Sequence, residues 1–177
     1  MLWYPDETIQ HAGIVTGLGG YAGHSHKYKK KGGSGYLFRT STVQDFSGVT
    51  GACLLVKTAV YDEMHGLDEQ FAVAFNDVDF CLRVRDAGYR IAWTPYAELI
   101  HYESKSRGGD EKDPVKAARF AAEQQRLYTI HGKENVLDDP YYNPNLTRDR
   151  EDFSESDDLR RLKEGRVTVR FRGGTLQ

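Results

Sequence analysis

Short apolar runs alternate with helix-like stretches along the middle of this chain. Residues 51–56 (GACLLV) have the length and composition of a buried strand, and residues 58–64 follow as a helix that Thr58 caps and Gly66 ends. Residues 71–75 form a second apolar run, which we expect to be extended. This succession of strand and helix predicts a mixed α/β domain.

The same pattern continues toward the middle of the sequence. A short helix is expected at residues 77–87, where Gly88 ends it, and strands are expected at residues 90–94 and 97–102. Pro95 separates the two strands because proline cannot donate a ladder hydrogen bond. The strands and helices together predict a mixed sheet flanked by helices.

The longest predicted helix begins at Asp113-Pro114 and runs to about Ile130, before Gly132. An N-cap aspartate followed by proline at the first helical position is a strong start signal, because both residues suit the unpaired N–H groups there. We expect an apolar stripe of this helix to face the core, consisting of Val115, Ala118, Ala122, Leu127 and Ile130.

The N-terminal region reads as the middle of a hairpin. Residues 2–4 and 8–14 have strand composition, and Pro5-Asp6-Glu7 between them is a turn, so the sequence is expected to be a fragment of a longer protein. Residues 15–35 are rich in glycine and lysine and predict a mobile surface loop. Residues 17–22 match G-x-G-x-x-A, but HSHKYKKKGGSG after them does not open a helix, which argues against a dinucleotide site.

The C-terminal region predicts less regular structure. Residues 138–146 (DDPYYNPNL) are an irregular aromatic and proline segment, and residues 148–164 are mostly charged. We therefore predict one domain over residues 1–153 and a charged tail over residues 154–177, in which residues 167–171 have the composition of one strand.

Composition excludes several classes of protein. The 24 Lys and Arg residues against 26 Asp and Glu residues argue against wholesale binding of nucleic acid or of an anionic membrane. Cys53 and Cys81 lie among apolar residues, as reduced cysteines do, and no apolar run approaches the roughly 20 residues of a membrane span. We expect a soluble, intracellular protein without a disulfide bond.

The segment FNDVDFCLRVRDAGYR (75–90) concentrates charge at a helix start. With Asn76 as N-cap, Asp79 reaches back to the cap, and Arg83 faces Asp79 in a pair worth about 0.2 to 0.5 kcal/mol if it is exposed. Asp77 caps nothing and projects from the first turn. It is either a favourable first-turn acid or a carboxylate that is free for chemistry.

The ordered set of segments at residues 47–104 (SGVTGACLLVKTAVYDEMHGLDEQFAVAFNDVDFCLRVRDAGYRIAWTPYAELIHYES) resembles the acceptor-side half of family 2 glycosyltransferases. These are inverting GT-A fold enzymes that use nucleotide sugars. The flanks YPDETIQHAG and DPYYNPNL resemble bacterial polysaccharide and O-antigen members. The likeness covers about residues 2–153 and implies that the chain is the C-terminal portion of a GT-A domain.

The resemblance assigns roles to particular residues. The family's helix opens with two acids, of which the second is the general base, so Asn76-Asp77 places the base at Asp77 and departs from the pattern at Asn76. Thr50, Gly51 and Ala52, together with Asn76, are expected to line the acceptor side, because small residues let a sugar approach the backbone. The implied partners are a nucleotide-diphospho-sugar donor and a glycan or lipid-linked acceptor.

The resemblance also implies a divalent cation, Mn²⁺ or Mg²⁺, that stabilises the leaving diphosphate in the complete enzyme. His101 in AELIHYES matches a histidine that sometimes supplements the metal ligands of the family, although a lone histidine after a strand is often only structural. His24-x-His26 has ligand-like spacing, but its glycine-rich setting favours a solvated loop. Lys27 to Lys31 could attract an anionic substrate or a membrane surface weakly.

Two family motifs are missing. The letters D-x-D occur at Asp77-Val78-Asp79, but this stretch belongs to the helix that carries the base, so the donor-binding half is expected upstream and the fragment alone is expected to be inactive. Residues 123–127 (EQQRL) depart from the Gln-x-x-Arg-Trp signature of processive synthases, which favours single-sugar addition. We expect a cytoplasmic enzyme, for which peripheral association with the inner face of the plasma membrane stays open.

Two other classes stay open from the sequence. A non-catalytic carbohydrate-binding or protein-interaction module is consistent with the missing half and with the aromatic pair Tyr141-Tyr142. A metal-dependent hydrolase that uses His24, His26 and nearby acids is supported by spacing alone.

Overall fold

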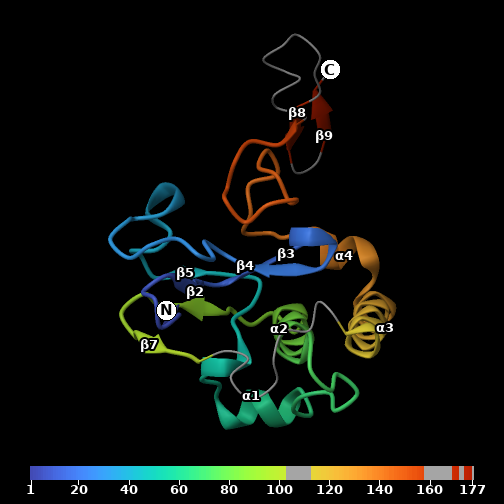
Figure 1. The fold of residues 1–177 in the computed structure, drawn as a ribbon. Helices are drawn as coiled ribbons and strands as arrows, with labels where there is room; N and C mark the ends of the chain where they lie inside the picture. Colours follow the sequence, from blue (N-terminus) through green and yellow to red (C-terminus); the bar gives the residue numbers. More distant parts are fainter. Residues whose placement is uncertain (103–112, 158–168, 172–173, 177) are drawn as a thin grey trace.

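A computed structural model describes residues 1–102, 113–157, 169–171 and 174–176, and these residues form the mixed α/β fold that the sequence predicts (Figure 1). The helices are α1 (Thr58–Glu63), α2 (Asn76–Asp86), α3 (Pro114–His131) and α4 (Lys133–Leu137), with 3₁₀ turns η1 (Leu18–Gly20), η2 (Tyr36–Phe38) and η3 (Gly51–Cys53). The strands are β1 (Leu2–Trp3), β2 (Ile9–His11), β3 (Ile14–Thr16), β4 (Ala22–His24), β5 (Gln44–Asp45), β6 (Ala92–Trp93), β7 (Leu99–Ile100), β8 (Val169–Phe171) and β9 (Gly174–Leu176).

The strands form small sheets instead of one large one. A mixed sheet has the order β2-β1-β7, in which β1 pairs antiparallel with β2 and parallel with β7, so the N-terminal hairpin prediction is confirmed. β3 pairs with β4, β5 with β6 and β8 with β9, all antiparallel. The ribbon shows α1 and α2 on one side of the central strands and the segment after α4 on the other (Figure 1).

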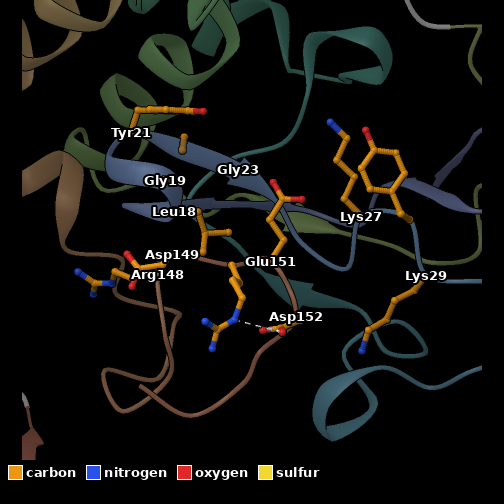
Figure 2. Close-up of a pocket in the computed structure, with 13 residues that line it drawn as sticks. Leu18, Gly19, Tyr21, Gly23, Lys27, Lys29, Arg148, Asp149, Glu151 and Asp152 are labelled. Carbon is orange, nitrogen blue, oxygen red and sulfur yellow. Dashed lines mark ion pairs between the residues drawn. The ribbon is translucent and has the colours of Figure 1, made fainter. Parts of the chain in front are cut away.

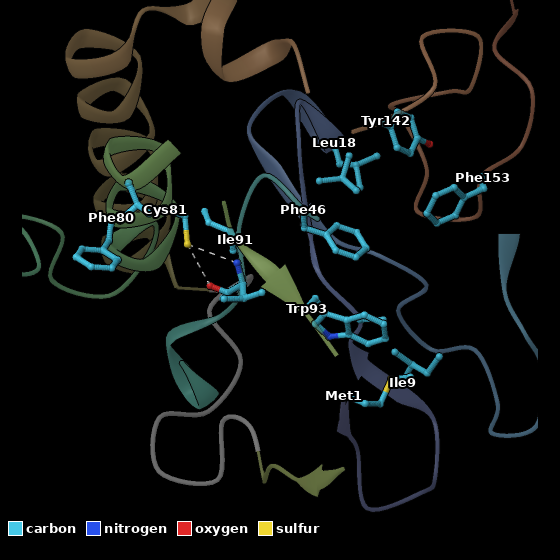
Figure 3. Packing of buried hydrophobic residues seen from close by; sticks show 14 of the residues in the cluster. Met1, Ile9, Leu18, Phe46, Phe80, Cys81, Ile91, Trp93, Tyr142 and Phe153 are labelled. Carbon is cyan, nitrogen blue, oxygen red and sulfur yellow. Dashed lines mark hydrogen bonds between the residues drawn. The ribbon is translucent and has the colours of Figure 1, made fainter. Parts of the chain in front are cut away.

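Helix α2 lies between two apolar clusters, which explains its position at the centre of the fold. Phe80, Cys81 and Val84 belong to the larger cluster with Phe46 and Trp93 (Figure 3). The opposite face of α2 enters a second cluster with α3 and α4, made of Ile14, Phe71, Phe75, Val78, Leu82, Leu127 and Val136. The helix is therefore buried on two faces, more than the amphipathic helix that the sequence suggests.

The predicted strand at residues 51–56 is wrong. Residues 51–53 form η3 and are exposed, and Leu54 continues in extended geometry with no strand of the described chain beside it. Leu55 is 98% exposed. An apolar run becomes a strand only where a neighbouring strand accepts its hydrogen bonds, and sequence alone does not reveal that neighbour.

The apolar run at residues 71–75 was expected to be extended, but residues 72–75 form bends and the run contains no strand. Other limits differ by smaller amounts, and the strand predicted over 90–94 shortens to β6 at 92–93. Helix α1 begins at Thr58 with Lys57 at its N-cap position, so Thr58 does not cap it. Such one- or two-residue differences at ends are ordinary, because end hydrogen bonds depend on tertiary contacts.

The predicted ends of helix α3 are confirmed, but most of the face predicted to pack against the core is wrong. The Asp113 carboxylate accepts a hydrogen bond from the N–H of Val115 at 2.9 Å, Pro114 is the first helical residue, and Gly132 has the positive φ of +78° that ends the helix. Val115 and Ile130 are 77% and 43% exposed. Leu127 is buried as predicted, but it shares the face toward the core with Phe120 and Glu123, so the rest of the predicted stripe is rotated away from the core.

Residues 15–35 are not simply a mobile loop. They contain the hairpin β3–β4 and the buried side chains of Leu18, Ser25 and His26. Exposed loop is confined to about residues 28–34. The G-x-G-x-x-A letters fall on η1 and β4 with no helix after them, in agreement with the rejection of a dinucleotide site.

Residues 153–156 pack against the preceding part of the domain. Phe153 is 7% exposed and stacks on His26 at 4.2 Å between ring centroids. Residues 154–156 pair with residues 145–147 through backbone hydrogen bonds. The strand expected within residues 167–171 is present as β8, while the domain boundary at residue 153 stays a prediction.

His26 gives the fold a dependence on pH. Its Nε2 accepts a hydrogen bond from the N–H of Tyr36 at 2.9 Å, so Nδ1 carries the proton and donates to Ser25 Oγ at 2.6 Å. Burial, with Lys29 and Arg39 nearby, lowers the pKa of His26 to about 3. Because the unfolded histidine binds a proton below about pH 6.5, the unfolded state gains protons that the folded state does not.

We expect the free energy of unfolding to fall as the pH is lowered from 7 to 5, by up to about 1.4 kcal/mol per pH unit for this group. Urea unfolding at several pH values measures the slope, and His26→Gln should reduce it. His65 is exposed, so His65→Gln serves as the matched control with the original slope. An unchanged slope in His26→Gln would contradict the assignment.

Candidate functional site

The site is built around the first turn of α2. Phe75 occupies the N-cap position in the left-handed conformation, with φ +64°, and Asn76 is the first helical residue. The sequence prediction that Asn76 is the N-cap is therefore wrong by one position. The Asn76 Oδ1 accepts a hydrogen bond from the N–H of Asp77 at 2.7 Å, so its side chain lies against the backbone at the helix start.

Asp77 is half-buried, and its carboxylate accepts hydrogen bonds from backbone groups. Its Oδ2 accepts a hydrogen bond from the N–H of Gly51 at 2.9 Å, and its Oδ1 accepts one from the N–H of Val78 at 2.9 Å. No residue in the described part of the chain forms a salt bridge with it. Each carboxylate oxygen keeps a further lone pair, so Asp77 can accept a proton from another group.

The exposed turn η3 lies directly beside Asp77. Thr50 caps this turn, since its Oγ1 accepts a hydrogen bond from the N–H of Ala52 at 3.3 Å, and its own N–H donates to His11 Nε2 at 3.3 Å. Gly51 and Ala52 are exposed. The structure thus brings together all five residues that the sequence assigned to the base and the acceptor side, namely Thr50, Gly51, Ala52, Asn76 and Asp77.

Asp79 has a different position from the one predicted. It is 1% exposed and accepts hydrogen bonds from Arg83 at 2.7 and 3.0 Å and from His131 Nε2 at 2.8 Å. Burial alone would raise its pKa, but the hydrogen bonds from His131 and Arg83 outweigh burial and hold the pKa of Asp79 below its usual value. The pair with Arg83 is therefore present, but it belongs to a buried ionic cluster with His131, and the predicted helix-capping role of Asp79 is wrong.

This arrangement also bears on the D-x-D letters at residues 77–79. Asp77 reaches the exposed turn η3, whereas both oxygens of Asp79 are occupied inside the protein by α2 and α3. The two carboxylates do not form a shared metal site, and no group of three possible metal ligands occurs among the described residues. The interpretation of these letters as accidental agrees with the structure.

His101 lies next to the mixed sheet. Its Nδ1 is 2.8 Å from Gln10 Oε1, and its N–H donates to the Trp3 carbonyl at 3.0 Å. Because the amide oxygen accepts, Nδ1 carries the proton and Nε2 retains its lone pair, the orientation in which a histidine binds a metal. The described residues supply this single imidazole and not a ligand set, so they do not hold a cation by themselves.

The pair His24-x-His26 does not form a ligand pair. The His26 ring is buried with both nitrogens hydrogen-bonded, which contradicts the solvated-loop prediction. His24 packs edge-on against His11, with ring centroids 4.9 Å apart, and its Nδ1 is 2.9 Å from the Gln10 carbonyl. The described residues contain no group of three possible metal ligands, so they offer no metal site for the hydrolase alternative.

Sequence reasoning missed Glu123 and His131 of α3. Glu123 is 4% exposed and accepts hydrogen bonds from the N–H groups of Val73 and Ala74, just before α2. His131, the last residue of α3, binds Asp79. The sequence did contain a signal for Glu123, which lies three residues after Phe120 and four residues before Leu127. This spacing places the acid in the middle of an apolar helix face.

Two of the cavities among the described residues have volumes above 500 Å³. An apolar one of about 660 Å³ lies beside η3 and is lined by Cys53, Leu54, Val60, Phe80 and Trp93 among others. The second, of about 520 Å³, lies between the β3–β4 hairpin and residues 148–152 (Figure 2). Its lining mixes Lys27, Lys29, Arg148 and Arg150 with Asp149, Glu151 and Asp152 and the ring of Tyr28.

Comparison with known proteins identifies relatives of this chain. It is 35% identical over 147 residues to the O-antigen biosynthesis protein RfbC of Myxococcus xanthus, which covers 82% of the chain and 11% of that protein. It is 32% identical over 80 residues to the N-acetylglucosaminyl-diphospho-decaprenol L-rhamnosyltransferase of Mycobacterium tuberculosis, over 45% of the chain and 24% of that protein. The chain is similar to a bacterial glycosyltransferase.

A protein of Sinorhizobium fredii named y4gI is 49% identical over 153 residues, which are 86% of the chain and 17% of that protein. The chain thus spans less than a quarter of the length of each of these relatives. No family model and no solved structure matches it. Among the helices that the structure describes, none combines the length and apolar character of a membrane span.

Proposed function

We propose that this chain is the acceptor side of an inverting, family 2-like glycosyltransferase with the GT-A fold. The protein that contains it would transfer one sugar from a nucleoside diphosphate to a glycan or lipid-linked acceptor in polysaccharide or O-antigen synthesis. The observation that carries the proposal is the position of Asp77, a half-buried carboxylate held by backbone N–H groups beside the exposed turn η3. The names of the relatives support the same class of reaction.

The proposed step is a single displacement. The Asp77 carboxylate takes the proton of an acceptor hydroxyl as that oxygen bonds to C1 of the donor sugar, and the bond from C1 to the nucleoside diphosphate breaks. The diphosphate leaves with the bonding electrons, and C1 is inverted. The N–H of Gly51 fixes the direction of the carboxylate, which a general base requires.

A divalent cation would stabilise the leaving diphosphate when bound. His101 is oriented to provide one imidazole ligand, and the other ligands are not among the described residues. We therefore assign no step of the reaction to the metal. The contribution of this chain is proton transfer and acceptor binding, and we place the protein at the cytoplasmic face of the plasma membrane, where lipid-linked acceptors are available.

The test is a transfer assay with the whole protein. Purified protein is incubated with Mn²⁺ or Mg²⁺, a panel of nucleotide sugars including a rhamnose donor, and polyprenyl-diphosphate saccharide acceptors. We expect a glycosylated product with inverted anomeric configuration for at least one pair, detected by mass spectrometry and NMR. Retained configuration in the product would exclude the single displacement, and no product from any pair would count against sugar transfer.

The acceptor side is tested at Gly51. A methyl group at this position would lie 3.6 Å from Asp77 Cβ, an ordinary contact, and a larger side chain would extend over the exposed surface in front of Asp77. We expect Gly51→Phe to raise the KM for the acceptor at least about 10-fold, because it occupies the approach of the hydroxyl. Gly51→Ala is the matched control and should change this KM by less than about 2-fold.

In both variants, hydrolysis of the nucleotide sugar by water should stay close to the original rate, since the donor does not approach through this turn. Loss of donor hydrolysis together with transfer would show that the turn serves the donor instead of the acceptor.

A second candidate is a non-catalytic saccharide-binding module, and the pocket of about 520 Å³ in Figure 2 favours it. Carboxylates and lysines that accept and donate hydrogen bonds, beside the ring of Tyr28, suit a polyhydroxylated ligand. Glycan binding that needs no divalent cation and is unchanged by Asp77→Asn would favour this function over transfer.

A further inference from the structure

The loop before α2 is fixed by a carboxylate from α3. Glu123 Oε1 accepts a hydrogen bond from the N–H of Val73 at 3.3 Å, and its Oε2 accepts one from the N–H of Ala74 at 2.6 Å. The side chain is 4% exposed, and Arg119 Nε lies 3.9 Å from Oε1. Glu123 thus binds two consecutive backbone donors that have no helix or sheet to satisfy them.

The next residue along this loop has an unusual backbone conformation. Phe75 has φ +64° and ψ +3°, a left-handed geometry that is uncommon for a bulky side chain and needs support from its surroundings. Its ring packs against Phe120 at 5.0 Å and Tyr21 at 5.5 Å between centroids. The support therefore comes from the same face of α3 that carries Glu123, together with the β3–β4 hairpin.

This conformation sets where α2 begins. The Phe75 carbonyl accepts the hydrogen bond from the N–H of Asp79 at 2.8 Å, at the start of the helix. Asp77 lies between these two residues, so a rotation at Phe75 moves its carboxylate relative to the N–H of Gly51. A displacement of about 1 Å of a catalytic group can lower a rate by about 100-fold.

We propose that Glu123 is a positioning residue for the base Asp77, acting through residues 73–75; this inference rests on the proposed function. Both oxygens of Glu123 are occupied by the loop, and the side chain is buried, so it does not contact the substrate itself. A carboxylate suits the task because it offers two acceptors. The amide of a glutamine offers one acceptor and turns an NH₂ group toward the second backbone N–H.

The first experiment measures steady-state kinetics of the whole protein with Glu123→Gln. We expect kcat to fall about 10- to 100-fold while the KM values for donor and acceptor stay within about 2-fold, because the binding surfaces are unchanged. Glu134 is an exposed acid of α4, and Glu134→Gln is the matched control with unchanged kcat. Hydrogen exchange should become faster at the amides of Val73 and Ala74 in Glu123→Gln only.

The second experiment is a double-mutant cycle with Asp77→Asn. If Glu123 acts through the base, adding Glu123→Gln to Asp77→Asn lowers kcat no further. Circular dichroism checks that each variant is folded. Should Glu123→Gln fail to fold, Glu123→Asp, which keeps the charge on a shorter side chain, replaces it with the same expected loss.

The outcomes separate this inference from the proposed function. Normal turnover of Asp77→Asn overturns the assignment of the base and, with it, the role of Glu123. If Asp77→Asn is slow but Glu123→Gln has normal turnover, only the positioning role is overturned. The same conclusion follows if the losses of the two variants multiply in the double variant.

Discussion

Asp77→Asn in the whole protein is expected to lower kcat for sugar transfer by about 10²- to 10⁴-fold, the usual contribution of a general base. The amide keeps the size of the side chain, and its oxygen can still accept the hydrogen bond from the N–H of Gly51, so the fold at the start of α2 should persist although the bond from the N–H of Val78 is lost. What is lost is the ability to take a proton. The KM for the nucleotide sugar should therefore change little.

The matched control is Asp86→Asn, which changes an exposed acid at the other end of the same helix and should leave kcat within about 2-fold. Titration of the donor by calorimetry measures donor affinity directly in both variants. A near-normal kcat for Asp77→Asn would show that another group accepts the proton, and the proposed mechanism would have to be abandoned.

The largest effect on stability is expected at Asp79. Asp79→Asn removes the charge that pairs with Arg83 and His131 inside the protein, and disrupting a buried ion pair in this way lowers the free energy of unfolding by about 3 to 5 kcal/mol. Asp45→Asn is the control, because Asp45 pairs with Arg90, whose side chain is 80% exposed, and such a surface pair contributes at most about 1 kcal/mol. Urea unfolding of the chain measures both.

Two further measurements define the Asp79 cluster. The double variant Asp79→Asn/Arg83→Met should recover part of the loss, because it no longer leaves a cation without its partner. The folded pKa of Asp79 is lowered, so its contribution is complete above the unfolded pKa near 3.9 and disappears as the pH falls through the lower folded value. This acid loss begins near pH 3.9, whereas the loss caused by His26 begins already near pH 6.5 and continues down to its folded pKa of about 3. Equal effects of Asp79→Asn and Asp45→Asn would contradict the buried cluster.

Local signals in the sequence predicted some elements well. The ends of α3 followed from Asp113-Pro114 and Gly132, because capping depends on residues that are neighbours in the chain. The stripe of α3 was wrong since Ala118 and Ala122 suggested an apolar face, whereas the buried face includes an acid, Glu123, that the pattern discounts. Burial of a charged residue depends on what it pairs with, and those partners are distant in sequence.

The candidate site was likewise predictable from the sequence only in part. The proximity of Gly51 and Asp77, 26 residues apart in the hydrogen bond that joins them, followed from a resemblance and not from periodicity. The partners of Asp79, His131 and Glu123 could not be predicted from the sequence, because they depend on how α3 packs against α2 and against the loop before α2. The catalytic role of Asp77 and the metal role of His101 stay predictions.

The double burial of α2 has a consequence for protein engineering. With cores on two faces and a buried ionic cluster between α2 and α3, most of the helix tolerates few substitutions, whereas Gly51 and Ala52 are exposed next to Asp77. Libraries that randomise residues 51–53 should therefore yield many folded variants, and selection from them is the practical route to a changed acceptor preference.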